Sequence, residues 1–285
     1  MTDKALGDQI PQFGKKDAPQ AGAGIGNLSG LAGGVSIQSA REGIAILAVA
    51  VLIVGGAELL LRVFEVPAFI MPTPSSILAV FASSEVSVIA QHFGHTLVEL
   101  LAGYAIGASI GLMLAAVITQ FPFAEKIVAP YILLLVTTPM LALVPLLILN
   151  FGFGYAPRII AVALASGPMV MINSATGFRR VDLGKVALAR SYGASTLQIF
   201  TKIRLPMAMP MVIVGLMIGA IFGLITAVGA EMAGGGFGLG SRLTTYSSVI
   251  RMPEFFACIL ILALLGILIY LFFFWLGKRL AGWES

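Results

Sequence analysis

Apolar and polar positions alternate along the chain on the scale of whole segments, with a polar first stretch followed by long apolar runs. A helix needs about 20 apolar residues to cross the hydrocarbon core of a membrane, at about 1.5 Å per residue. Runs close to this length predict an all-α, polytopic membrane protein with six transmembrane helices. They cover residues 43–61, 93–118, 127–149, 159–175, 207–230 and 255–276.

The composition supports this prediction. The 285 residues are 59% hydrophobic and 11% charged, with a mean hydropathy of +1.01, whereas soluble domains carry about 25% charged residues. A soluble enzyme is therefore excluded. The single cysteine, Cys258, cannot form an intrachain disulfide or a thiolate metal cluster.

The positions of the 17 Lys and Arg residues indicate the topology. If the amino terminus is cytoplasmic, thirteen of them lie on the cytoplasmic side, and the excess predicts both termini there. These thirteen are Lys4, Lys15, Lys16, Arg41, Lys126, Arg179, Arg180, Lys185, Arg190, Lys202, Arg204, Lys278 and Arg279. The outer side keeps Arg62, Arg158, Arg242 and Arg251. We therefore interpret the net charge of +4 as topological and predict no nucleic-acid partner.

The chain divides into four predicted segments. Residues 1–42 are a Gly-rich, disordered cytoplasmic tail, and residues 281–285 form a cytoplasmic end. Residues 43–92 hold the first transmembrane helix and a short helix in the outer interface that starts near Pro74. Residues 93–280 form the core, in which a Gly-rich segment, 234–240, is a flexible outer loop and residues 243–250 form a short helix.

The loop of residues 176–206 is the most informative segment, with six cations against the one anion Asp182. Residues 186–191 are compatible with a helix, and Gly193 can end it at positive φ. Ser195 can cap a second short helix, and Pro206 suits the start of a membrane helix. The pattern predicts a rigid helix-turn-helix knob on the cytoplasmic surface, although the charges alone would also be explained by topology.

This loop resembles that of the membrane subunits of type I bacterial ABC importers, whose motif is Glu-Ala-Ala, three residues, Gly, nine residues, Ile-x-Leu-Pro. Ala189, Gly193, Ile203, Leu205 and Pro206 match five of its seven positions, while Ala187 and Leu188 depart from it. In that family the first helix docks on the ATPase subunit. The resemblance implies the same for residues 185–194, which include Lys185, Arg190 and Ala194, but without a charge contact from Ala187.

The resemblance extends over residues 92–280, and the order of its motifs is similar to the branch that imports nitrate, taurine, sulfonates and vitamin precursors. These motifs include Thr96-Leu-Val-Glu99, Ala142-Leu-Val-Pro145-Leu, Phe151-Gly-Phe-Gly154 and Ala230-Glu231. The resemblance implies a type I permease fold, a second copy of the subunit, two ATPase subunits and an extracytoplasmic binding protein in the bacterial inner membrane. The chain has no Walker A sequence, so ATP and Mg would be bound by the partner.

Five residues are candidates for the substrate path: Glu99, Met140, Asn150, Asn173 and Glu231. Glu99 lies well inside a span, where a carboxylate either forms a structural hydrogen bond or faces a cavity. His95 lies one turn before it, but no third metal ligand is identified, so we expect no metal site. The asparagines and methionines have the alternative roles of helix-capping and packing. Gly103, Gly107 and Gly111 recur every four positions and predict a close helix contact.

Two alternative functions remain at this point. An ion-coupled secondary transporter would carry inverted repeats and polar clusters at the bilayer centre, and neither is evident from the sequence. A membrane anchor for a cytoplasmic protein would explain the knob but not the proline-rich third span.

Overall fold

The computed structural model describes residues 40–280, and every regular element among them is helical. The helices are α2 (Ala40–Val63), α3 (Pro74–Val80), α4 (Glu85–Gln120), α5 (Pro122–Thr137), α6 (Met140–Phe151), α7 (Tyr155–Arg179), α8 (Leu183–Ser191), α9 (Thr196–Ile199), the π-helical segment η1 (Phe200–Arg204), α10 (Leu205–Gly234), α11 (Leu239–Ser248) and α12 (Met252–Leu280). The chain divides into two units, Met1–Gly56 and Ala57–Ser285, with the boundary inside α2. Most of the predicted cytoplasmic tail, and the predicted end at 281–285, lie outside the described residues.

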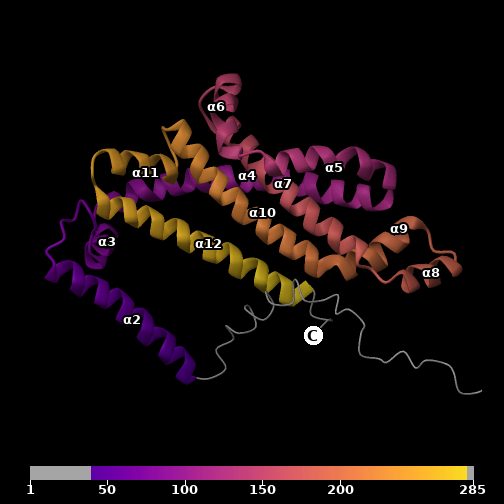
Figure 1. Cartoon of the computed structure of the whole chain (residues 1–285), viewed down its shortest axis with the longest axis horizontal. Helices are drawn as coiled ribbons and strands as arrows, with labels where there is room; N and C mark the ends of the chain where they lie inside the picture. The colour runs from indigo at the N-terminus through magenta and orange to yellow at the C-terminus, as the bar shows by residue number, and fades with distance from the viewer. Residues whose placement is uncertain (1–39, 281–285) are drawn as a thin grey trace, which may run out of the picture. The chain divides into compact units, whose positions relative to one another are not determined.

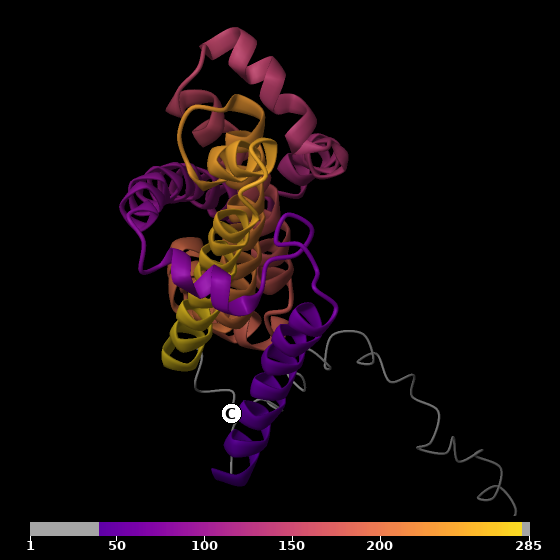
Figure 2. The same ribbon diagram turned by 90° about the vertical axis from the view of Figure 1, so that its left-hand side faces the viewer.

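Five helical stretches among residues 40–280 are long and apolar enough to cross a membrane, and α5 with α6 makes a sixth if the pair counts as one span. The predicted third span, residues 127–149, is broken into α5 and α6, which meet at a bend of 96°. Pro139 has no amide to continue α5, and it holds Thr138 in an extended conformation. Figures 1 and 2 show the two helices diverging at this point.

Helix α7 is the centre of the larger unit, packed along α4 on one side and along α10 on another. The contact with α4 depends on the glycines of α4. A Cβ atom on Gly103 would lie 2.6 Å from Cβ of Val162, and one on Gly107 would lie 2.5 Å from the carbonyl oxygen of Ala163. The predicted small-residue packing face is confirmed.

The short helices lie at the ends of the long ones. Figure 1 shows α8 and α9 at one end of α7 and α10, with α11 at the other end. Helix α3 begins at Pro74 as predicted, with the Thr73 side chain accepting a hydrogen bond from the Ser76 amide. Helix α11 starts four residues before its predicted position, directly after Gly238, which has a φ of +92°.

Candidate functional site

The segment between α7 and α10 is a helix-turn-helix, as the sequence predicts. Asp182 caps α8 by accepting a hydrogen bond of 2.8 Å from the Gly184 amide. Gly193 ends the turn at a φ of +78°, a region that side chains disfavour. Ser195 and Gln198 form a reciprocal capping box at the start of α9. Each of these local signals is readable in the sequence, which explains why the prediction succeeds here.

A small apolar core joins the two helices of this knob, residues 181–204. Val181, Val186 and Ile199 are buried in it. The motif residues divide into two groups. Ala189, Ala194 and Ile203 pack against this core, with Leu205 and Pro206 also partly buried, whereas Lys185, Ala187, Arg190 and Gly193 are exposed.

The surface of the knob carries large apolar side chains that are mostly exposed in the described chain. Leu188 is 60% exposed and Tyr192 is 84% exposed. They lie in the same short helix and turn as Lys185 and Arg190. Because α8 is outside every candidate span, the hydrocarbon core of a membrane does not cover these side chains. The knob therefore presents a mixed apolar and basic surface suited to another protein.

A cavity of about 280 Å³ lies where α5 bends into α6. Helices α7 and α10 complete its wall with Pro168 and Thr226. Pro168 has no amide, so the carbonyl of Leu164, another lining residue, lacks its helical donor. The cavity is thus mainly apolar with a few polar backbone groups, as in sites for small ligands.

The structure separates the five predicted path residues. Met140 lines the cavity. Asn150 is exposed and Asn173 is partly buried, and each amide donates to a carbonyl of its own helix at 2.8 Å. Glu99 and Glu231 are absent from the cavity wall and belong to a polar cluster nearer α11.

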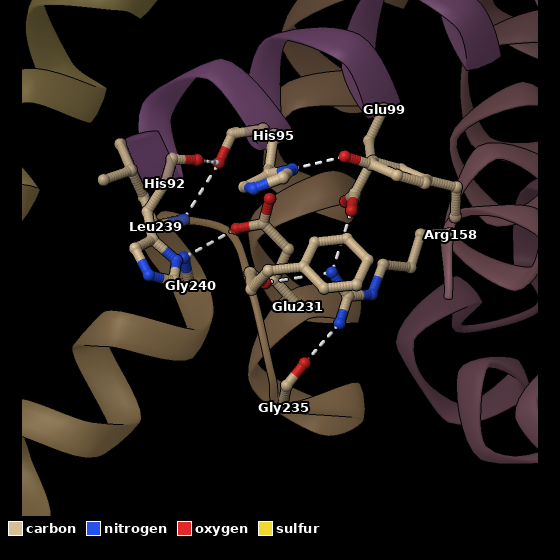
Figure 3. A network of polar contacts seen from close by, with 11 residues as sticks. His92, His95, Glu99, Arg158, Glu231, Gly235, Leu239 and Gly240 are labelled. Atoms are coloured by element: carbon tan, nitrogen blue, oxygen red, sulfur yellow. Dashed lines mark hydrogen bonds and ion pairs between the residues drawn. The ribbon is translucent and has the colours of Figure 1, made fainter. Parts of the chain in front are cut away.

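This polar cluster connects α4, α7, α10 and the loop before α11 (Figure 3). Arg158 of α7 donates from Nη1 to Oε1 of Glu99 on α4 at 2.8 Å. The Arg158 side chain is 2% exposed and Glu99 is 0% exposed. Glu231 near the end of α10 is also fully buried. Among residues 44–280, no three His, Cys, Asp or Glu side chains are grouped to hold a metal ion.

The predicted flexible loop, residues 234–240, is tied to this cluster through residues 235–240, and that expectation is corrected. The carbonyl oxygens of Gly235 and Phe237 both accept hydrogen bonds from the Arg158 guanidinium, and the Phe237 ring lies 4.2 Å from it. The Leu239 amide donates to Oγ1 of Thr96 at 2.9 Å. Two glycines let the backbone approach this closely, since a side chain on Gly238 or Gly240 would collide with Glu231.

A second set of polar contacts surrounds the cluster toward the start of α4. Arg242 contacts His92 at 2.7 Å. Glu85 accepts a hydrogen bond of 3.0 Å from the Tyr246 hydroxyl. It also forms an ion pair with Arg251 at 2.9 Å. Burial, with the hydrogen bond to Glu85, raises the pKa of Tyr246 to about 12, so its hydroxyl keeps the proton that it donates. These contacts hold α11 and the start of α12 on α4.

Sequence reasoning missed Arg158, which it assigned to the outer surface as a topological charge. One signal was available: a lone arginine at the start of an apolar run needs a buried partner, and Glu99 is a carboxylate in another apolar run. His95 lies one turn before Glu99 on α4, as predicted, and forms a hydrogen bond with Tyr155 of α7.

The apolar helices, the cavity and the knob define a polytopic membrane protein with a surface for a partner outside the membrane. Residues 107–282, more than half of the chain, match the family described as the binding-protein-dependent transport system inner membrane component. The chain belongs to this family. It is therefore a multi-pass inner-membrane permease subunit of an ABC importer, a system in which a separate subunit hydrolyses ATP and a solute-binding protein delivers the cargo.

Individual relatives agree with this assignment. The putative aliphatic sulfonates transport permease protein SsuC of Bacillus subtilis is 30% identical, over 77% of this chain and 80% of that protein. The taurine transport system permease protein TauC of Escherichia coli is 28% identical, over 68% of this chain and 71% of that protein. A crystal structure of an amino acid ABC transporter with histidines shares the fold, with a TM-score of 0.57 at 20% identity over 72% of this chain and 97% of that one.

Proposed function

We propose that two copies of this chain form the translocation path of an importer for a small organic anion of the aliphatic sulfonate or taurine type. In this proposal α8 of each copy docks on one ATPase subunit, which binds ATP and Mg. The exposed apolar surface of the knob carries the proposal, because Leu188 and Tyr192 would be buried by such docking. The names of the relatives support the class of substrate.

The proposed orientation places the knob and both termini in the cytoplasm. The thirteen cations that the sequence analysis assigned to the inside include Lys185 and Arg190 of the knob. The end with α11 then faces the binding protein. A substrate released there would reach the cavity at the bend between α5 and α6, and we propose that Met140, Thr138 and Thr226 contact it in transit.

Helix docking can be tested with a charge placed in the proposed contact. The chain is co-expressed with its ATPase subunit, extracted in detergent and recovered through a tag on the ATPase. Leu188→Glu should abolish co-purification, because a buried, unpaired carboxylate costs several kcal/mol. The matched control is Val249→Glu, since Val249 is similarly exposed, at 58%, but follows α11 at the other end.

Substrate class is tested separately, by uptake of taurine and of an alkanesulfonate into vesicles that hold the whole complex with its binding protein. Uptake that requires ATP and is lost in Leu188→Glu supports the proposal. Full co-purification of Leu188→Glu would refute docking through α8. ATP-driven uptake of other solutes, with none of either sulfonate, would refute the substrate class alone.

A further inference from the structure

The buried cluster near α11 contains unequal numbers of acidic and basic groups. Glu99 and Glu231 are both 0% exposed, and among residues 44–280 Arg158 is the one cation that bonds to a carboxylate of this cluster. If both carboxyl groups were ionised, the cluster would carry one uncompensated negative charge away from water. An unpaired buried charge is among the most expensive features that a protein can hold.

The hydrogen bonds show where the imbalance lies. Glu99 uses Oε1 to accept from Arg158, and Glu231 uses Oε2 to accept from the Gly240 amide at 2.6 Å. The remaining oxygen of each group, Oε2 of Glu99 and Oε1 of Glu231, is buried with no donor among the described residues. The two carboxyl groups are neighbours in this cluster (Figure 3). Two ionised carboxylates in this arrangement would repel, whereas a single proton would join them.

We propose that Glu99 and Glu231 share one proton, carried by Glu231, and that this proton holds the loop of residues 235–240 closed over Arg158. Glu99 is the ionised member because it pairs directly with the guanidinium. Glu231 accepts only a neutral amide and can donate its proton to Oε2 of Glu99. Thr96 also lies beside Glu231, but its one hydroxyl hydrogen is directed to the His92 carbonyl at 3.2 Å.

The same atoms that bind the proton also hold the loop. Oε2 of Glu231 fixes the amide of Gly240, and the partner of Glu99, Arg158, fixes the carbonyls of Gly235 and Phe237. Loss of the proton leaves two repelling carboxylates, and their separation breaks one of these attachments. The closed loop therefore binds the proton more tightly than the open loop, and a rise in pH favours opening.

Other ionisable groups surround the pair, from each neighbouring element. His92 and His95 lie on α4, Tyr155 on α7 and Arg242 on α11. His92 pairs with Arg242 and His95 with Tyr155. Among the hydrogen bonds of the described chain, none joins these four groups to either carboxylate. The proposed proton belongs to the carboxyl pair alone.

Infrared spectroscopy detects this proton directly. In the complete complex in lipid nanodiscs at neutral pH, a protonated carboxylic acid gives a C=O stretch that shifts in D2O. The wild type should show this band, and Glu231→Gln should remove it. Glu85→Gln, which changes a partly exposed carboxylate at the rim, should leave it unchanged. The absence of a Glu231-dependent band in the wild type would overturn the proposal, as would a band that only Glu99→Gln removes.

Hydrogen exchange measures the opening of the loop. In the wild type, the amides of Leu239 and Gly240 should exchange about tenfold faster or more at a pH high enough to remove the infrared band than at neutral pH. The rates are corrected for the pH dependence of intrinsic exchange. Glu231→Gln, whose side-chain NH2 donates to Glu99 without a titrating proton, should keep them protected at every pH. If Glu231→Gln does not fold, coincidence of band loss and faster exchange in the wild type remains the test. Exchange that does not follow the band would refute the control of the loop by this proton.

Discussion

Nη1 of Arg158 and Oε1 of Glu99 lie 2.8 Å apart in a site closed to solvent, although 59 residues separate them in the chain. The pair joins α7 to α4 at the end where the loop of residues 235–240 closes. Neither residue can be replaced alone without leaving a buried group unsatisfied. The pair is thus both a tie between two helices and the attachment point of the loop.

Glu99→Gln should destabilise the protein by about 3–5 kcal/mol, because it leaves the Arg158 guanidinium buried without its carboxylate. The measurement is the melting temperature of the purified protein in detergent. Glu85→Gln breaks an ion pair whose side chains are 42% and 25% exposed, and should cost less than about 1 kcal/mol. Equal losses in the two variants would contradict the buried ion pair.

A double substitution separates the ion pair from simple packing. Glu99→Gln with Arg158→Gln removes both charges, and should be more stable than Glu99→Gln alone by about 1 kcal/mol or more. The double-mutant cycle uses the same thermal measurement on all four proteins. Losses that simply add would mean that the two side chains do not interact energetically.

Gly193→Val should reduce ATPase co-purification and uptake together. A Cβ atom there would meet nothing within 4 Å, so the effect arises from the φ of +78°, which costs a β-branched residue roughly 1–3 kcal/mol. Gly152→Val is the control, since Gly152 has a φ of +75° and equally open surroundings but lies between α6 and α7. A normal partner yield with Gly193→Val would show that the turn does not position α8.

Gly107→Leu should prevent α4 from packing on α7, because its Cβ atom would already lie 2.5 Å from the Ala163 carbonyl oxygen. Overpacking costs about 1–3 kcal/mol or more, and a backbone atom cannot move aside as a side chain does. Size-exclusion chromatography should show loss of the monodisperse peak. Gly94→Leu on the same helix has open space and should elute like the wild type. Similar elution of both variants would refute close packing at Gly107.

A cysteine at Lys185 should react only with reagents that reach the cytoplasm, whereas a cysteine at Val249 should react from outside intact cells. The native thiol Cys258 is 0% exposed and should stay silent, so the background needs no further substitution. Labelling of the Lys185→Cys protein from outside would reverse the proposed orientation.

Much of the architecture follows from local sequence. The span positions depend on runs of apolar residues long enough to cross a bilayer. The knob depends on Gly193, Ser195 and Pro206, each of which favours its backbone conformation without help from distant residues. The glycine face of α4 is equally local, because residues four apart on a helix share one side.

The tertiary structure alone decided the contents of the polar cluster. The sequence indicates a topological charge at Arg158 and a flexible loop at residues 234–240, since the partners of both lie far away in the chain. Arg158 lies 77 and 79 residues from the carbonyls that it binds. Likewise Pro139 predicts a break, but the 96° angle between α5 and α6 is a property of the folded chain. Such features depend on which helices become neighbours, and packing among α4, α7 and α10 determines that only once the chain has folded.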